Sequence, residues 1–177
     1  MITHSGRVIE NRISGERIVI RQNAADTDGR LLAFDLFLPP GAHVPAGHAH
    51  PGQEELFTLV FGQVRFRLRG RTVTASPGDQ VAIPRGAPHW FGNAGPTTAH
   101  LRVEVRPALR TEEFFLANEA MSRRGHFLGT RLPRLSDLAL VLLEFQPEVS
   151  VPNLPAFVVR ACLEPLAWLG RRRRRGA

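Results

Sequence analysis

The chain has 177 residues, of which 43% are hydrophobic, which is enough for one folded domain with a substantial core. Its formal net charge is +7, but the run Arg171–Arg175 supplies five of these charges, and the rest of the chain is only +2. Most of the positive charge therefore lies at the C-terminal end of the chain, and we expect no nucleic-acid partner. One cysteine excludes an intrachain disulfide, and no signal peptide or membrane span is evident, so a cytoplasmic location is expected.

Residues 1–108 have the pattern of short strands separated by turns. The predicted strands are rich in Val, Ile, Phe and Thr, and Gly, Pro, Asp or Asn lie between them. They cover residues 17–22, 31–39, 55–62, 63–70, 71–75, 80–84 and 99–107. In residues 63–70 the alternation is complete, with Val64, Phe66 and Leu68 on one face and arginines on the other. Several short strands of this kind indicate an antiparallel sandwich or barrel.

Residues 109–177 are predicted to form an α-helical extension. Thr111 is a candidate N-cap followed by two acids, and the leucines of 132–145 recur at helical spacing. A third helix begins at Pro155 and is disturbed by Pro165, and residues 171–177 are expected to be a disordered basic tail. The apolar helical faces are expected to pack on the barrel or on a second copy. A weak contact of the last helix and the arginines with a membrane surface is the alternative.

The stretch 47–62 concentrates imidazole and carboxylate groups. Because side chains alternate along a strand, His48 and His50 point to the same side, about 6–7 Å apart. In the strand that follows, Glu55 shares a face with Phe57 and Leu59, which places its carboxylate in the interior. A buried carboxylate needs a cation or strong donors, and a divalent metal is the obvious candidate.

Two motifs in this region, taken together, resemble the paired signatures of the cupin superfamily. The first motif consists of Gly41, His48, His50, Glu55 and Gly62. The second consists of Gly78, Pro84, Gly86, His89 and Asn93. The resemblance extends over about residues 30–107, and its one departure is an extra residue between Gly41 and His48.

The resemblance implies an antiparallel double-stranded β-helix, the jelly-roll barrel of cupins, with a helical extension after it. Carried over residue by residue, it implies a metal site formed by His48, His50, Glu55 and His89. Three neutral imidazoles and one carboxylate suit one divalent transition metal ion, namely Fe, Mn, Ni, Zn or Cu. It also implies a homodimer, paired through a sheet edge.

The substrate pocket is predicted from the apolar side chains expected inside the barrel. These are Phe34, Leu36, Phe57, Phe66, Ile83 and Phe91. Because the strand arginines alternate with the apolar residues, no clamp for an anionic substrate is expected. This pattern favours a small, largely apolar or aromatic chelating substrate. The resemblance, with the coordination positions that four protein ligands leave open, implies a metal-dependent oxygenase similar to dioxygenase-type cupins. A metal-assisted isomerase or decarboxylase and a non-enzymatic ligand-binding module are the alternatives.

Overall fold

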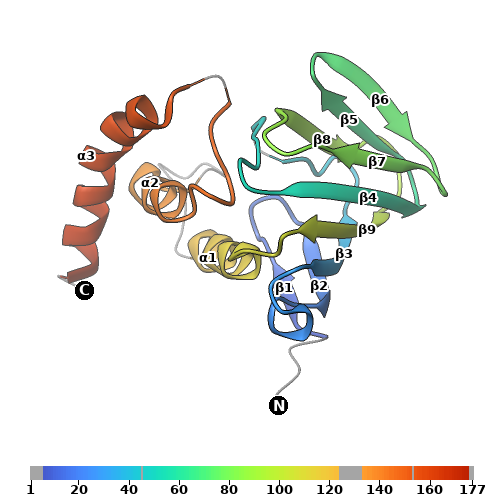
Figure 1. The fold of residues 1–177 in the computed structure, drawn as a ribbon, viewed down its shortest axis with the longest axis horizontal. Helices are drawn as coiled ribbons and strands as arrows, with labels where there is room; N and C mark the ends of the chain where they lie inside the picture. The colour runs from blue at the N-terminus through green and yellow to red at the C-terminus, as the bar shows by residue number, and fades with distance from the viewer. Residues whose placement is uncertain (1–5, 45, 124–132, 153, 176–177) are drawn as a thin grey trace.

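The computed structural model describes residues 6–44, 46–123, 133–152 and 154–175. Two antiparallel sheets are followed in the chain by three α-helices, so the predicted mainly β fold with a helical extension is confirmed. The helices lie together on one side of the β domain (Figure 1). Among the described residues, none of the helices is long and apolar enough to cross a membrane.

The larger sheet has the strand order β1-β2-β3-β9-β4-β7, and the smaller has the order β6-β5-β8. The strands of the larger sheet are β1 (Val8–Glu10), β2 (Arg17–Gln22), β3 (Leu32–Leu38), β9 (Ala99–Arg106), β4 (Glu54–Phe61) and β7 (Gln80–Ile83). Those of the smaller sheet are β6 (Arg71–Ala75), β5 (Val64–Leu68) and β8 (His89–Asn93), and a short 3-10 helix, η1 (Ala25–Thr27), lies between β2 and β3. All seven predicted strands are present, whereas β1 and β8 were not predicted.

The core lies between the two sheets, where alternate residues of each strand turn inward. In β5, Val64 and Phe66 are buried while Arg65 and Arg67 are exposed, as the alternation predicted. The rings of Phe57, Phe66 and Phe91 meet at centroid separations of 5.1–5.8 Å. Aromatic rings at such distances pack edge-to-face or tilted, which fills the space between the sheets.

Asp35 is a buried charge on the outer side of β3. It is 3% exposed and is paired with Arg21 and with His100, whose Nε2 lies 3.0 Å from Asp35 Oδ1. Burial raises the pKa of this carboxyl, but the hydrogen bonds and charges of His100 and Arg21 outweigh burial, so that the pKa falls below its ordinary value. The charge is therefore held in place by partners on two neighbouring strands.

The helical extension is α1 (Thr111–Arg123), α2 (Leu135–Glu144) and α3 (Ala156–Arg175). α1 packs on the barrel, where Phe115 meets Phe34 edge-to-face at 5.1 Å. A second core holds α1 and α2 together around Met121 and Val141. The predicted division into domains 1–108 and 109–177 stays a prediction.

α3 packs against α2 and differs from its prediction at its end. The two helices approach closely at Gly170, where a Cβ would lie only 2.9 Å from Leu140 Cδ1. The arginines 171–175, expected to belong to a disordered tail, continue α3 as helix. Consecutive arginines have good helix propensity, so a helix already packed against α2 can extend through them.

Candidate metal centre

The four predicted ligands come from three places in the fold. His48 and His50 lie on the segment before β4, Glu55 lies on β4, and His89 begins β8. His48 and His89 form an isolated bridge, with His48 N donating to His89 O at 3.0 Å and His89 N donating to His48 O at 2.9 Å. The segment around His48 was predicted to be a strand, but it pairs only through such single bridges.

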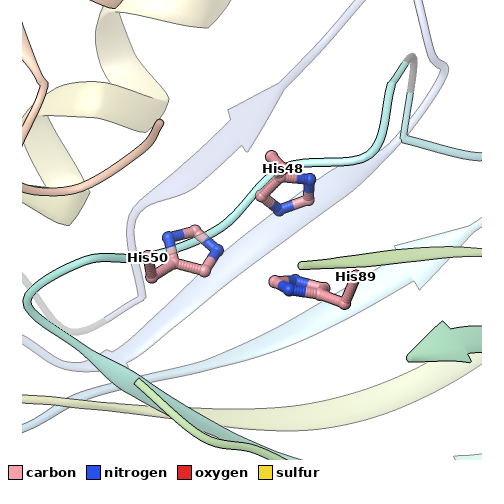
Figure 2. Close-up of side chains that lie close together, drawn as sticks. All are labelled: His48, His50 and His89. Atoms are coloured by element: carbon pink, nitrogen blue, oxygen red, sulfur yellow. The ribbon is translucent and has the colours of Figure 1, made fainter. Parts of the chain in front are cut away.

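The structure brings these four side chains together. The ligand atoms of the three histidines lie within 4.8 Å of one another, and their rings converge in Figure 2. Glu55 Oε2 is 3.3 Å from His50 Nε2 and 3.2 Å from His89 Nε2. Glu55 is 9% exposed, as its alternation with Phe57 and Leu59 predicted, while Glu54 is exposed.

The opposite nitrogen of each imidazole faces a backbone carbonyl. Nδ1 of His48 contacts the oxygen of Ala46 at 3.3 Å, and Nδ1 of His89 contacts that of Ala87 at 3.1 Å. His50 Nδ1 makes a short contact with the oxygen of Glu148. A carbonyl oxygen only accepts, so each Nδ1 carries a proton, and in a neutral ring Nε2 then keeps the lone pair. Metal-ligating histidines in proteins are oriented in this way.

Three buried atoms at this site have no hydrogen-bond partner among the described residues: His50 Nε2, His89 Nε2 and Glu55 Oε2. They are the atoms that approach one another. Buried polar atoms are almost always paired, because an unpaired one loses its hydration without compensation. Lone pairs of two imidazoles and a carboxylate that converge without donors therefore fit a divalent cation.

The four side chains of the site shift one another's protonation. Burial, together with the neighbouring imidazoles of His50 and His89, lowers the pKa of His48 to about 3. Burial alone would raise the pKa of Glu55, but positive charge on His50 and His89, when these rings are protonated, outweighs burial and lowers the pKa to about 2. At neutral pH the site therefore offers an ionised carboxylate and a neutral His48, which are the forms that bind metal.

The six residues predicted to line the substrate pocket all belong to the hydrophobic core. Of these, Ile83 also borders a cavity of about 360 Å³, together with Glu55 and other residues of β4, β7 and β9. A second cavity, of about 390 Å³, lies beside the site and is lined by Gly47, Arg67, Arg69, Gly70, Pro88, His89, Trp90 and Pro152. Alternation correctly placed Arg67 outside the core, but it gave no sign that a cavity next to His89 lies there.

Comparison with known proteins supports the fold described above. Residues 34–105 match the family model described as "Cupin domain". The crystal structure of a predicted oxalate decarboxylase from Thermotoga maritima is similar at a TM-score of 0.51 and 22% identity, over 60% of this chain and 99% of that one. The cupin domain of Schizosaccharomyces pombe Cnp3 is similar at a TM-score of 0.50 and 13% identity, over 60% of this chain and 72% of that one.

At these identities the structural similarity concerns the fold. None of the curated protein sequences matches the chain. The family match contains Glu55 and all three histidines of the cluster, and it ends at residue 105, before the helical extension. The family match at residues 34–105 and the fold together support a cupin superfamily domain in this chain.

Proposed function

We propose that this protein holds one divalent transition metal ion on His48, His50, Glu55 and His89. The observation that supports this proposal is that His50 Nε2, His89 Nε2 and Glu55 Oε2 converge, are buried and have no hydrogen-bond partner within the described part of the chain. Each of these two histidines is held from behind by an Nδ1–H bonded to a carbonyl, and Glu55 is held by β4. When bound, such a metal supplies Lewis acidity and, if redox-active, electron exchange with dioxygen. The protein's part is to orient the three Nε2 atoms, to keep His48 neutral and to keep the Glu55 carboxylate ionised.

We propose further that the metal serves an oxygenase that acts on a small, largely apolar or aromatic chelating substrate. The surroundings of the site support this assignment. Phe91 lies parallel to the His89 ring at a centroid distance of 6.5 Å, and it packs on Phe57 and Phe66. His48 is the most exposed of the three histidines, so its side of the site is where a ligand can approach.

A second candidate is a metal-assisted decarboxylase or isomerase that works without oxygen on an anionic substrate. The cavity beside His89 favours it, because Arg67 and Arg69 both line that cavity. Arginine binds carboxylates through two parallel hydrogen bonds, and Trp90 adds an aromatic wall. Two arginines beside His89 count against the expectation that the protein has no clamp for an anionic substrate.

Metal content is the first measurement. Untagged protein purified without chelators is compared by mass spectrometry with the double variant His48→Ala, His89→Ala. The matched control is His43→Ala, which removes an exposed imidazole from the same part of the chain. We expect about one transition metal per chain in the wild type and control, and loss from the double variant. No metal in any of them, even after reconstitution, would contradict the metal site and favour a ligand-binding module.

The reaction is then decided by two assays on metal-loaded protein. Oxygen uptake with phenols, flavonols or diketones supports the oxygenase. Anaerobic turnover of small carboxylates, lost in Arg67→Ala, supports the second candidate. Tight binding without turnover in either assay would leave a non-enzymatic module.

We also propose two macromolecular contacts. One is a homodimer formed through a sheet edge, which rests on the resemblance to cupins. The other is a weak contact of α3 with an anionic membrane surface. On α3, Phe157 is 75% exposed and Trp168 is 53% exposed, and the guanidinium of Arg172 stacks 4.6 Å above the Trp168 ring. Aromatic residues next to arginines are typical of helices that lie at membrane surfaces.

A further inference from the structure

The segment 145–150, which links α2 to α3 and is called the strap below, lies along the metal-site segment 48–53. Figure 1 shows it in orange beside the teal chain that leads into β4. Ala49 and Ser150 form an antiparallel bridge, with Ser150 N donating to Ala49 O at 2.9 Å and Ala49 N donating to Ser150 O at 3.2 Å. Gly52 N donates to Pro147 O at 3.3 Å. The strap is thus bonded on both sides of His50.

Between these two points the strap reaches the imidazole itself. His50 Nδ1 donates to the backbone oxygen of Glu148, in a contact that is buried on both sides. The acceptor is a carbonyl, so this bond fixes the tautomer of His50 and turns Nε2 toward Glu55 Oε2, 3.3 Å away. Nδ1 of each of the other two histidines bonds to a carbonyl two residues away in the chain, whereas Nδ1 of His50 bonds to a carbonyl 98 residues further along.

Glu148 is itself held firmly. It is 3% exposed, its N–H donates to Phe145 O at 3.0 Å, and its Oε1 accepts from the N–H of Arg110 at 3.1 Å. Space under the strap is also tight, because a Cβ on Gly52 would lie 3.1 Å from Leu109 Cδ1 and 3.3 Å from Pro147 O. The position of the Glu148 carbonyl therefore depends on the junction between β9 and α1.

We propose that the strap orients a ligand of the metal centre and that Glu148 is the positioning residue for His50. The proposal rests on the metal site proposed above. The family match ends at residue 105, so this support comes from the helical extension and is supplied by this chain in addition to the cupin domain. Loss of a hydrogen-bond partner behind a metal ligand typically lowers metal affinity about 10- to 100-fold.

Two pairs of full-length variants test the strap. Glu148→Leu removes the acceptor for Arg110 N–H while filling similar space, and Glu148→Gln retains an acceptor. Ser150→Pro removes the N–H that bonds Ala49 O, and Ser150→Ala retains it. Co(II) affinity and its d–d absorption are measured for each, with thermal unfolding of the metal-free protein as the control for folding. Long-range ¹H–¹⁵N spectra at about pH 8, where imidazole is neutral, report the His50 tautomer without metal.

We expect Glu148→Leu and Ser150→Pro to bind Co(II) about 10- to 100-fold more weakly, with an altered d–d spectrum and loss of the single Nδ1–H tautomer of His50. Glu148→Gln and Ser150→Ala should match the wild type. Unchanged affinity and tautomer in Glu148→Leu and Ser150→Pro, with a wild type that binds Co(II), would overturn the role of the strap and leave the metal site standing. A wild type that binds no Co(II) would instead overturn the proposed function on which the role depends.

Discussion

Metal-free protein should lose stability as the pH falls from about 8 to about 5, because folded His48 resists protonation. Its pKa is about 3, against an ordinary value of 6.5. The unfolded chain takes up this proton below pH 6.5, while the folded chain does not, so the stability is complete above 6.5 and declines as the pH falls toward 3. Each pH unit below 6.5 is then worth about 1.4 kcal/mol, or about 2 kcal/mol of unfolding free energy at about pH 5.

Urea unfolding of chelator-treated protein, followed by tryptophan fluorescence at several pH values, measures this loss. The variant His48→Asn has no imidazole to protonate at this position, so its unfolding free energy should fall by about 2 kcal/mol less than that of the wild type between about pH 8 and pH 5. His43→Asn, which removes an exposed histidine, is the control and should follow the wild type. Equal losses in the wild type and His48→Asn would refute the reasoning and show that His48 is freely solvated.

Three further predictions concern other parts of the structure. Gly62→Ala should lower the unfolding free energy by about 1–3 kcal/mol, since Gly62 has a φ of +87° and a Cβ there would lie 2.8 Å from Ala99 Cα. A calorimetric melting temperature equal to that of the wild type would contradict this prediction. Asp35→Asn should make the loss of stability in acid less steep. In the wild type the Asp35 ion pairs stabilise the fold fully above the ordinary pKa of 3.8, and less as the pH falls through the lower pKa of the folded state. Acid titration followed by circular dichroism measures the difference. Trp168→Ser should weaken co-sedimentation of the protein with phosphatidylserine vesicles. High salt should also abolish the binding if Arg172 and its neighbours supply the attraction. Equal binding by the variant and the wild type would exclude α3 as the contact.

The course of the strands and the inward face of β4 could be predicted from the sequence. Alternation is a property of a strand's backbone, so it placed Glu55 inside and Glu54 outside before any partner strand was known. The same rule put Phe66 in the core and Arg67 outside it. β8 escaped prediction, because its five residues begin directly after a Pro-rich turn and include a glycine, Gly92, that weakens a strand pattern.

The convergence of His89 with the other three predicted ligands was predicted only through the resemblance to cupins. Alternation brings His48 and His50 to one side, but His89 lies 39 residues further on, and no local rule states where that residue arrives. In the structure a bridge between His48 and His89 makes the connection, with paired hydrogen bonds of 3.0 and 2.9 Å. Such a bridge forms only when the barrel closes.

Local patterns in the chain are enough to predict which side chains face inward, which segments form helices, and which residue types can bind a metal. The surroundings of these residues depend on tertiary packing: the carbonyl of Glu148, in the extension, accepts from His50 Nδ1, and Arg67 lines a cavity beside His89. Backbone periodicity acts over a few residues, whereas a hydrogen bond spanning 98 positions depends on how α1 and α2 pack on the barrel, and that packing sums many weak apolar contacts.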